Sequence, residues 1–233
     1  MLEVTVEGGF IAPSARLGQL QTVVVDFDGK IYTQAVDFGG QPTLIPGVAM
    51  RDVGADGAAA IMQAIQEAGL DQNGNDGGAP GDLGVTVFTV EIDGEEYVNR
   101  IVASGPGQPG HPRGGDNPAI PLLNRLLDPA ETWGASDVTT VIYQPVAYRI
   151  YSAPAASGGI DIMAWPFAAD PADFGSPATP DFGVTGLRSG IVTGADAQAF
   201  AAAVAAAGSQ VTFTFDGDAY QVWVRPLLPD ELG

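Results

Sequence analysis

Apolar and polar residues alternate along residues 211–224, which is the pattern of two half-buried strands. Asp216-Gly217 separates the two arms, and both residues tolerate the positive φ that a type I′ turn requires. A two-residue turn here sets Phe213 opposite Tyr220 and brings the apolar side chains of both arms to one face. The pattern therefore predicts a tight β-hairpin with one buried face.

Two earlier segments repeat this construction. In each, a tyrosine follows the turn glycine by three residues, and a bulky apolar residue precedes the turn aspartate by three residues. A shared turn and a shared cross-strand pair predict the same hairpin at all three places. The two further pairs are Val25 with Tyr32 across Asp28-Gly29, and Val90 with Tyr97 across Asp93-Gly94.

Two alanine-rich segments, residues 54–69 and 194–208, predict a pair of related helices. Each opens with Gly-Ala-Asp and stops at glycine, the usual residue just past a helix end. Apolar residues recur at helical spacing through residues 55–68. Thr193 and Asp196 resemble a capping box at the start of the second helix.

Three more segments complete the predicted elements. Residues 2–7 alternate as a strand, and residues 118–129 form a short leucine-rich helix. Residues 138–152 have the composition of one long strand or two shorter ones, interrupted at Pro145. With the strand predicted at 160–167, they form a longer-looped equivalent of the first hairpin.

The elements thus run hairpin, helix, hairpin, then a Gly/Pro-rich segment at 105–117, then the same order again. Strands and helices do not alternate, so a parallel doubly wound sheet is not expected. We predict an α+β fold, with antiparallel sheets built from Asp-Gly hairpins and a few helices. Two pseudo-repeated hairpin–helix–hairpin halves, about 1–104 and 118–233, meet in a single compact domain, 1–233.

Composition and charge narrow the function classes. The chain has 233 residues, of which 45% are hydrophobic, and no apolar run is long enough to span a bilayer. It has no cysteine, which excludes disulfides and thiol catalysis. The formal net charge of −19 disfavours nucleic acid and anionic membranes as partners. Solubility, cation binding, a salty habitat and an extracytoplasmic location all remain open as reasons for this charge.

Most candidates for catalysis fail on chemical grounds. His111, the only histidine, lies in a Gly/Pro segment that cannot orient an imidazole for a triad. Zinc needs several His or Cys ligands, and Lys30, the only lysine, does not lie in a phosphate-loop pattern. The carboxylates beside the three turns are expected to be solvated, so they do not predict a glycosidase pair.

One acidic, glycine-rich loop resembles a calcium-binding loop, with oxygen ligands at alternate positions and an aspartate at the twelfth. It departs from that pattern because the sixth residue is not glycine, the twelfth is not glutamate, and a strand follows. A solvated acidic loop is the other interpretation. The predicted metal ligands are Asp71, Asn73, Asn75, Asp76 and Asp82.

Trp223 is the candidate binding residue. In the predicted strand its side chain points to the face opposite Val222 and Val224. It either packs against a second layer or is exposed as a contact residue for a partner.

The C-terminal segment carries a family resemblance. Residues 216–224 (DGDAYQVWV) precede residues 225–231 (RPLLPDE), and the chain opens with EGGF at 7–10. In these features it resembles a group of uncharacterised actinobacterial proteins, many of which look secreted or lipid-anchored. The resemblance implies a bacterial, extracytoplasmic location and no particular activity. The lipid-bearing cysteine of an anchored member is not present.

Two hypotheses of function follow. The first is a non-enzymatic extracytoplasmic binding or structural module, with a protein partner, such as a subunit of a surface assembly. The internal repeat, the acidity and the lack of a catalytic constellation favour it. The alternative is a calcium- or metal-dependent hydrolase that uses carboxylates, which the loop at 71–82 suggests. The oligomeric state stays open.

Overall fold

The computed structural model describes residues 1–8, 16–35, 43–75, 84–102, 117–155, 161–178, 183–205, 207–209 and 211–232. The chain divides into two compact units. Unit 1 comprises Met1–Phe10, Gln21–Gln34 and Val48–Tyr143, and unit 2 comprises Ile11–Leu20, Ala35–Gly47 and Gln144–Gly233. Each unit combines one sheet with one or two helices, so the predicted α+β class is confirmed.

Unit 1 holds an 8-stranded sheet in the order β5-β7-β6-β1-β2-β3-β4-β8. Every neighbouring pair is antiparallel except β5 with β7. The strands are β1 (Leu2–Gly8), β2 (Val23–Val25), β3 (Lys30–Gln34), β4 (Val48–Asp52), β5 (Gly74–Asn75), β6 (Gly84–Ile92), β7 (Glu95–Val102) and β8 (Thr139–Ile142).

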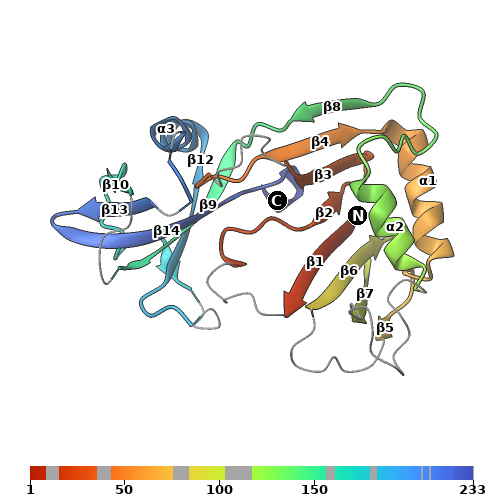
Figure 1. The fold of residues 1–233 in the computed structure, drawn as a ribbon, viewed down its shortest axis with the longest axis horizontal. Helices are drawn as coiled ribbons and strands as arrows, with labels where there is room; N and C mark the ends of the chain where they lie inside the picture. Colours follow the sequence, from red (N-terminus) through yellow and green to blue (C-terminus); the bar gives the residue numbers. More distant parts are fainter. Residues whose placement is uncertain are drawn as a thin grey trace. The chain divides into compact units, whose positions relative to one another are not determined.

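Two helices cover one face of this sheet, α1 (Gly54–Glu67) and α2 (Ala119–Leu127) (Figure 1). Both match the predicted helices to within two residues. Ile61 and Ile65 of α1 and Leu122 and Leu126 of α2 are buried against the strands. Phe88, on β6, is fully buried in the same core. The apolar stripe of each helix therefore forms the core of unit 1.

Unit 2 holds a 6-stranded sheet in the order β10-β13-β14-β9-β12-β11, with α3 (Gly194–Val204) packed on one face. Phe200 of α3 lies in the core with Phe213 and Ile150. A short 3-10 helix, Pro229–Leu232, ends the described chain. The strands are β9 (Ala147–Pro154), β10 (Asp161–Ala164), β11 (Ser176–Pro177), β12 (Arg188–Thr193), β13 (Val211–Phe215) and β14 (Asp218–Pro226).

Two of the three Asp-Gly hairpins have the predicted register. Val90 pairs with Tyr97 across the β6–β7 turn, and Phe213 pairs with Tyr220 across the β13–β14 turn. In both turns the aspartate and the glycine have positive φ, as a type I′ turn requires. The shared sequence pattern thus has a shared backbone geometry.

The first hairpin differs by one residue. Tyr32 pairs with Val24, and Val25 pairs with Ile31, so the predicted Val25–Tyr32 pair is wrong. The reason is the carboxylate of Asp26, which accepts N–H bonds from Asp28 at 3.0 Å and Lys30 at 2.8 Å. This side-chain bonding stabilises a loop one residue longer than a type I′ turn.

The helix starts also depart in one detail from the prediction. Thr193 makes no side-chain cap hydrogen bond, so the predicted capping box with Asp196 is wrong. Instead, Gly54 and Gly194 both have positive φ, at 62° and 58°. The repeated Gly-Ala-Asp therefore marks a left-handed residue at the start of each helix, a conformation that glycine adopts without steric cost. Helix α3 ends at Val204, before Gly208, the glycine at which the sequence predicted the helix to stop.

The division into units does not follow the predicted halves, because unit 1 continues to Tyr143. Pro145 has no N–H to donate and separates β8 from β9, which join different sheets. The predicted hairpin of β9 with β10 is wrong, since β10 pairs in parallel with β13. His111 and most of the Gly/Pro-rich segment lie outside the described residues.

The C-terminal RPLLPDE segment has a structural role. Arg225 Nη2 bonds Glu231 Oε1 at 2.5 Å, and Glu231 Oε2 accepts the Leu228 N–H at 3.0 Å. Leu227 and Leu228, which lie between Arg225 and Glu231 in the chain, are buried. The ion pair therefore joins the two ends of this C-terminal segment.

Candidate functional site

Strand β8 forms one edge of the unit 1 sheet. It pairs with β4 alone, with Thr140 opposite Arg51 and Ile142 opposite Ala49. All four β8 residues are exposed. Within the described residues, no further strand pairs with the outer side of β8. This edge is therefore a free template for another strand.

The ladder to β4 decides which backbone groups of β8 point outwards. Tyr143 N–H donates to Val48 O at 2.9 Å, which places this pair among the hydrogen-bonded pairs. Hydrogen-bonded pairs alternate along an antiparallel ladder, so Val141 and Thr139 also face β4. Thr140 and Ile142 accordingly turn their N–H and C=O groups away from the sheet.

Two side chains of this edge strand are exposed and apolar, and they do not block the pairing of a further strand. Val141 is 44% exposed and Ile142 is 60% exposed, and they lie on opposite faces of the strand. Edges of natural sheets are commonly blocked by lysine, proline or a bulge. Strand β8 contains none of these. An exposed apolar edge of this kind is typical of a contact surface.

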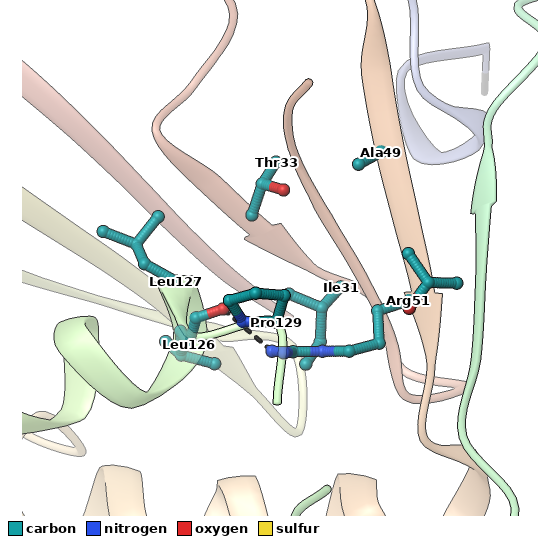
Figure 2. Close-up of a pocket in the computed structure, with 8 residues that line it drawn as sticks. Ile31, Thr33, Ala49, Arg51, Leu126, Leu127 and Pro129 are labelled. Carbon is teal, nitrogen blue, oxygen red and sulfur yellow. Dashed lines mark hydrogen bonds between the residues drawn. The ribbon is translucent and has the colours of Figure 1, made fainter. Parts of the chain in front are cut away.

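A shallow hollow lies beside β8 on the face that carries Ile142, because Ala49, its cross-strand partner, lines the hollow. The empty volume is about 300 Å³, open solvent included. Figure 2 shows the sheet residues facing the end of α2 across this space. The lining residues are Ile31, Thr33, Ala49, Arg51, Leu126, Leu127, Pro129 and Thr140.

Arg51 fixes the end of α2 at this hollow. The residue is 5% exposed, and its guanidinium donates to the carbonyl oxygen of Leu126 at 2.9 Å (Figure 2). It also donates to the carbonyl oxygen of Asp128. These are carbonyls that a helix end leaves without intrahelical partners. Burial lowers the pKa of the Arg51 guanidinium, while Asp128 and Glu131 oppose the shift. Arginine stays charged in proteins, so a buried cation anchors one wall of the hollow.

The predicted calcium loop is described only in part. Asp71 and Asn73 are exposed, and Asn75 lies in β5, whereas Asp76 and Asp82 lie outside the described residues. Asn73 Oδ1 accepts the Val98 N–H at 2.8 Å, so this oxygen already has a structural partner. The calcium site stays a prediction.

Asn99 of β7 fastens the start of that loop. Its buried side-chain amide donates to Gln72 O at 2.9 Å and to Leu70 O at 3.3 Å. These two bonds tie residues 70–72 to the edge of the sheet. The loop therefore begins from a defined position beside β7.

Asp71 shares its surroundings with the β6–β7 turn. The Tyr97 hydroxyl donates to Glu95 Oε2 at 2.8 Å, and this bond is the main cause of the raised pKa of Tyr97. The negative charges of Asp71 and Asp93 raise the pKa of Tyr97 further. In the part of the chain that the structure describes, no three Asp, Glu or His side chains form a metal-binding group.

Trp223 packs in unit 2 rather than standing free. It is half-buried beside Leu17, Ala153 and Leu187, on the sheet face opposite α3. This matches the second-layer interpretation of the residue. A binding role for Trp223 stays a prediction.

Sequence reasoning did not find β8 or Arg51 as parts of a site. The pattern of residues 138–152 indicated strands, but the open edge depends on sheet order, which the pattern does not contain. Comparisons with protein-family models, with curated proteins and with solved structures gave no match. None of the helices in the described residues is long and apolar enough to cross a membrane.

Proposed function

We propose that the chain is a non-enzymatic, extracytoplasmic protein-binding or structural module that engages its partner by strand addition at β8. The observation that carries the proposal is the outward row of backbone groups at Thr140 and Ile142. An extended segment of a partner adds a strand there through main-chain hydrogen bonds. The acidity of the chain and its resemblance to secreted proteins support the location.

The hollow beside β8 supplies selectivity. In strand addition, main-chain bonds give affinity, and pockets that receive alternate side chains of the added strand give specificity. An added strand on β8 directs every second side chain to the face where the hollow lies. Leu127, 43% exposed, lines this space with apolar surface, and Ile142, 60% exposed, lies on the same face of the sheet as the cross-strand partner of Ala49. An apolar side chain of the partner fits this position.

A peptide selection tests the proposal. Ten-residue peptides displayed on phage are selected against the whole chain, and each binder is then measured by fluorescence anisotropy. The variant Ile142→Lys places a charge on the hollow face, where it opposes an added strand. We expect it to weaken selected binders by about tenfold or more, which corresponds to about 1.4 kcal/mol.

Val141→Lys is the matched control, because it adds the same charge on the same strand but on the opposite face. Thr140→Pro adds a backbone test, since the Thr140 N–H faces outwards and its loss leaves the bonds to β4 in place. The proposal predicts that Ile142→Lys and Thr140→Pro both reduce binding more than Val141→Lys. Binders that ignore all three changes would contradict it.

Calcium binding at residues 71–82 is a second candidate property. The specific observation is that Asp71 lies within electrostatic reach of Tyr97, where Glu95 and Asp93 also act. An added cation would reduce the repulsion among these carboxylates. The proposed ligands are Asp71, Asn73, Asn75, Asp76 and Asp82, which supply the oxygen atoms that calcium prefers. A carboxylate-based hydrolase at this loop is the corresponding alternative function.

Isothermal titration with calcium chloride tests this candidate. We expect binding with a dissociation constant of about 0.1–1 mM, the range of extracellular calcium modules. Asp71→Asn should remove the heat, while Asp196→Asn, an exposed acid on α3, should leave it unchanged. The absence of heat at millimolar calcium in the unmodified chain would exclude the site.

A further inference from the structure

We infer that the segment that adds to β8 is cationic at one end and apolar at the other, with lysine or arginine next to Thr139 and an apolar side chain next to Ile142. This inference rests on the proposed strand addition and assigns the partner's chemistry. It follows from an uneven distribution of charge along the edge.

The Ile142 end of β8 is apolar. Ile142 and Leu127 are exposed, Ala49 is the cross-strand partner of Ile142, and Leu127, Ile31 and Ala49 line the hollow. Pro129 closes the same hollow from the end of α2 and is itself exposed. A partner side chain that enters here removes apolar surface from water, which favours a valine, isoleucine or leucine.

The Thr139 end of β8 is acidic. Asp52 is the cross-strand partner of Thr139, and Asp137 lies two residues before it in the chain and is exposed. Asp128 is exposed at the end of α2, and its own carbonyl accepts a bond from Arg51, the cross-strand partner of Thr140. Asp137 and Asp128 are therefore exposed carboxylates near this end of β8, whereas Asp52, on the inner side of β8, is the cross-strand neighbour of Lys30.

The cations near this end of β8 are already engaged, and Lys30, the cross-strand partner of Asp52, forms ion pairs with Asp26 and Asp28. Arg51 is buried and donates to two backbone carbonyls. Arg125 is paired with Glu131 at 3.0 Å and lies over the Trp133 ring at 4.0 Å. Among the described residues, neither Asp128 nor Asp137 has an ion-pair partner. A basic side chain on an incoming strand supplies the missing charge.

The same charges disfavour a second copy of this chain as the occupant. The chain has 28 acidic residues against 9 Lys and Arg, and a formal net charge of −19. Strand β8 itself, Thr139–Ile142, contains no basic residue. Pairing two copies at β8 would bring together two acidic surfaces without compensation, and like charges suppress such association. Charge complementarity selects a basic partner that is not this chain.

The test uses the selected ten-residue peptides and the whole chain. We expect the binders to share lysine or arginine near one end and alternating apolar residues towards the other. Replacing the basic residue by glutamine should weaken binding about threefold, which is the scale of an exposed ion pair. The substitution Asp137→Asn should weaken binding of the basic peptide by a similar factor and leave the affinity for the glutamine peptide unchanged.

Glu96→Gln is the matched control, because Glu96 is an exposed acid on β7, towards the other edge of the same sheet. It should leave both peptides unchanged. One result would overturn the inference but leave the proposed function supported. In that result, the selected peptides carry no basic residue, lose affinity for the Ile142→Lys variant and bind the Asp137→Asn variant as well as the unmodified chain. A dimer of the chain in sedimentation experiments that Ile142→Lys dissociates would also overturn it. If no peptide distinguishes Ile142→Lys from Val141→Lys, the proposed function itself fails.

Discussion

Replacing Gly29 by alanine is expected to lower the free energy of unfolding of unit 1 by about 2–5 kcal/mol, because left-handed strain costs about 1–2 kcal/mol and a steric clash about 1–3 kcal/mol. Gly29 has a φ of 85°, and an added Cβ would lie 2.3 Å from the carbonyl oxygen of Gly54. Val53 also donates its N–H to Gly29 O at 3.0 Å. The first turn is thus packed directly against the start of α1.

The other two turn glycines provide matched controls. Gly94 and Gly217 have similar positive φ values, but an added Cβ would meet nothing within 4 Å at either position. Their replacement by alanine should cost only the backbone strain, about 1–2 kcal/mol. Hydrogen exchange followed peptide by peptide through a urea series measures each unit separately. Equal losses for Gly29→Ala and Gly94→Ala would show that the turn does not contact α1 as described.

Replacing Phe213 by alanine is expected to destabilise unit 2 by about 3–5 kcal/mol, the range for deleting a buried aromatic side chain. Phe213 is 0% exposed and sits on β13 within the core. Its ring lies edge-to-face with the ring of Trp165, and the two ring centroids are 5.7 Å apart. The substitution therefore removes both buried area and an aromatic contact.

Phe27→Ala is the control for this change, because Phe27 is 65% exposed at the tip of the first hairpin. It should alter stability by no more than about 0.5 kcal/mol. Urea denaturation detected by tryptophan fluorescence, to which Trp165 contributes, measures the difference. A loss for Phe213→Ala no larger than that for Phe27→Ala would contradict the assignment of the unit 2 core.

Local sequence rules predicted the hairpins well, because a two-residue turn determines its own register. Val90 with Tyr97 and Phe213 with Tyr220 follow directly from Asp-Gly. The first hairpin departed because Asp26 competes for the backbone N–H groups of the turn. A side-chain acceptor just before a turn is visible in the sequence, yet its effect depends on the backbone geometry that it helps to create.

Sheet order could not be predicted from the same pattern. The parallel pairing of β10 with β13 joins segments far apart in the chain, and no turn between them determines it. The assignment of β8 to unit 1 and β9 to unit 2 likewise depends on long-range packing. For this reason the apolar residues Val141 and Ile142 suggested a strand but not an open edge. Arg51, a buried cation that bonds carbonyls, has no local pattern at all.

Amide hydrogen exchange by NMR, with and without a selected peptide, tests strand addition at β8 most directly. In the free chain the Thr140 and Ile142 amides should exchange rapidly, because they face away from β4, while the Val141 amide is protected. Saturation with the peptide should slow exchange at Thr140 and Ile142 and leave the hairpin turns unchanged. Protection that appears elsewhere, with Thr140 and Ile142 still exchanging rapidly, would contradict the account.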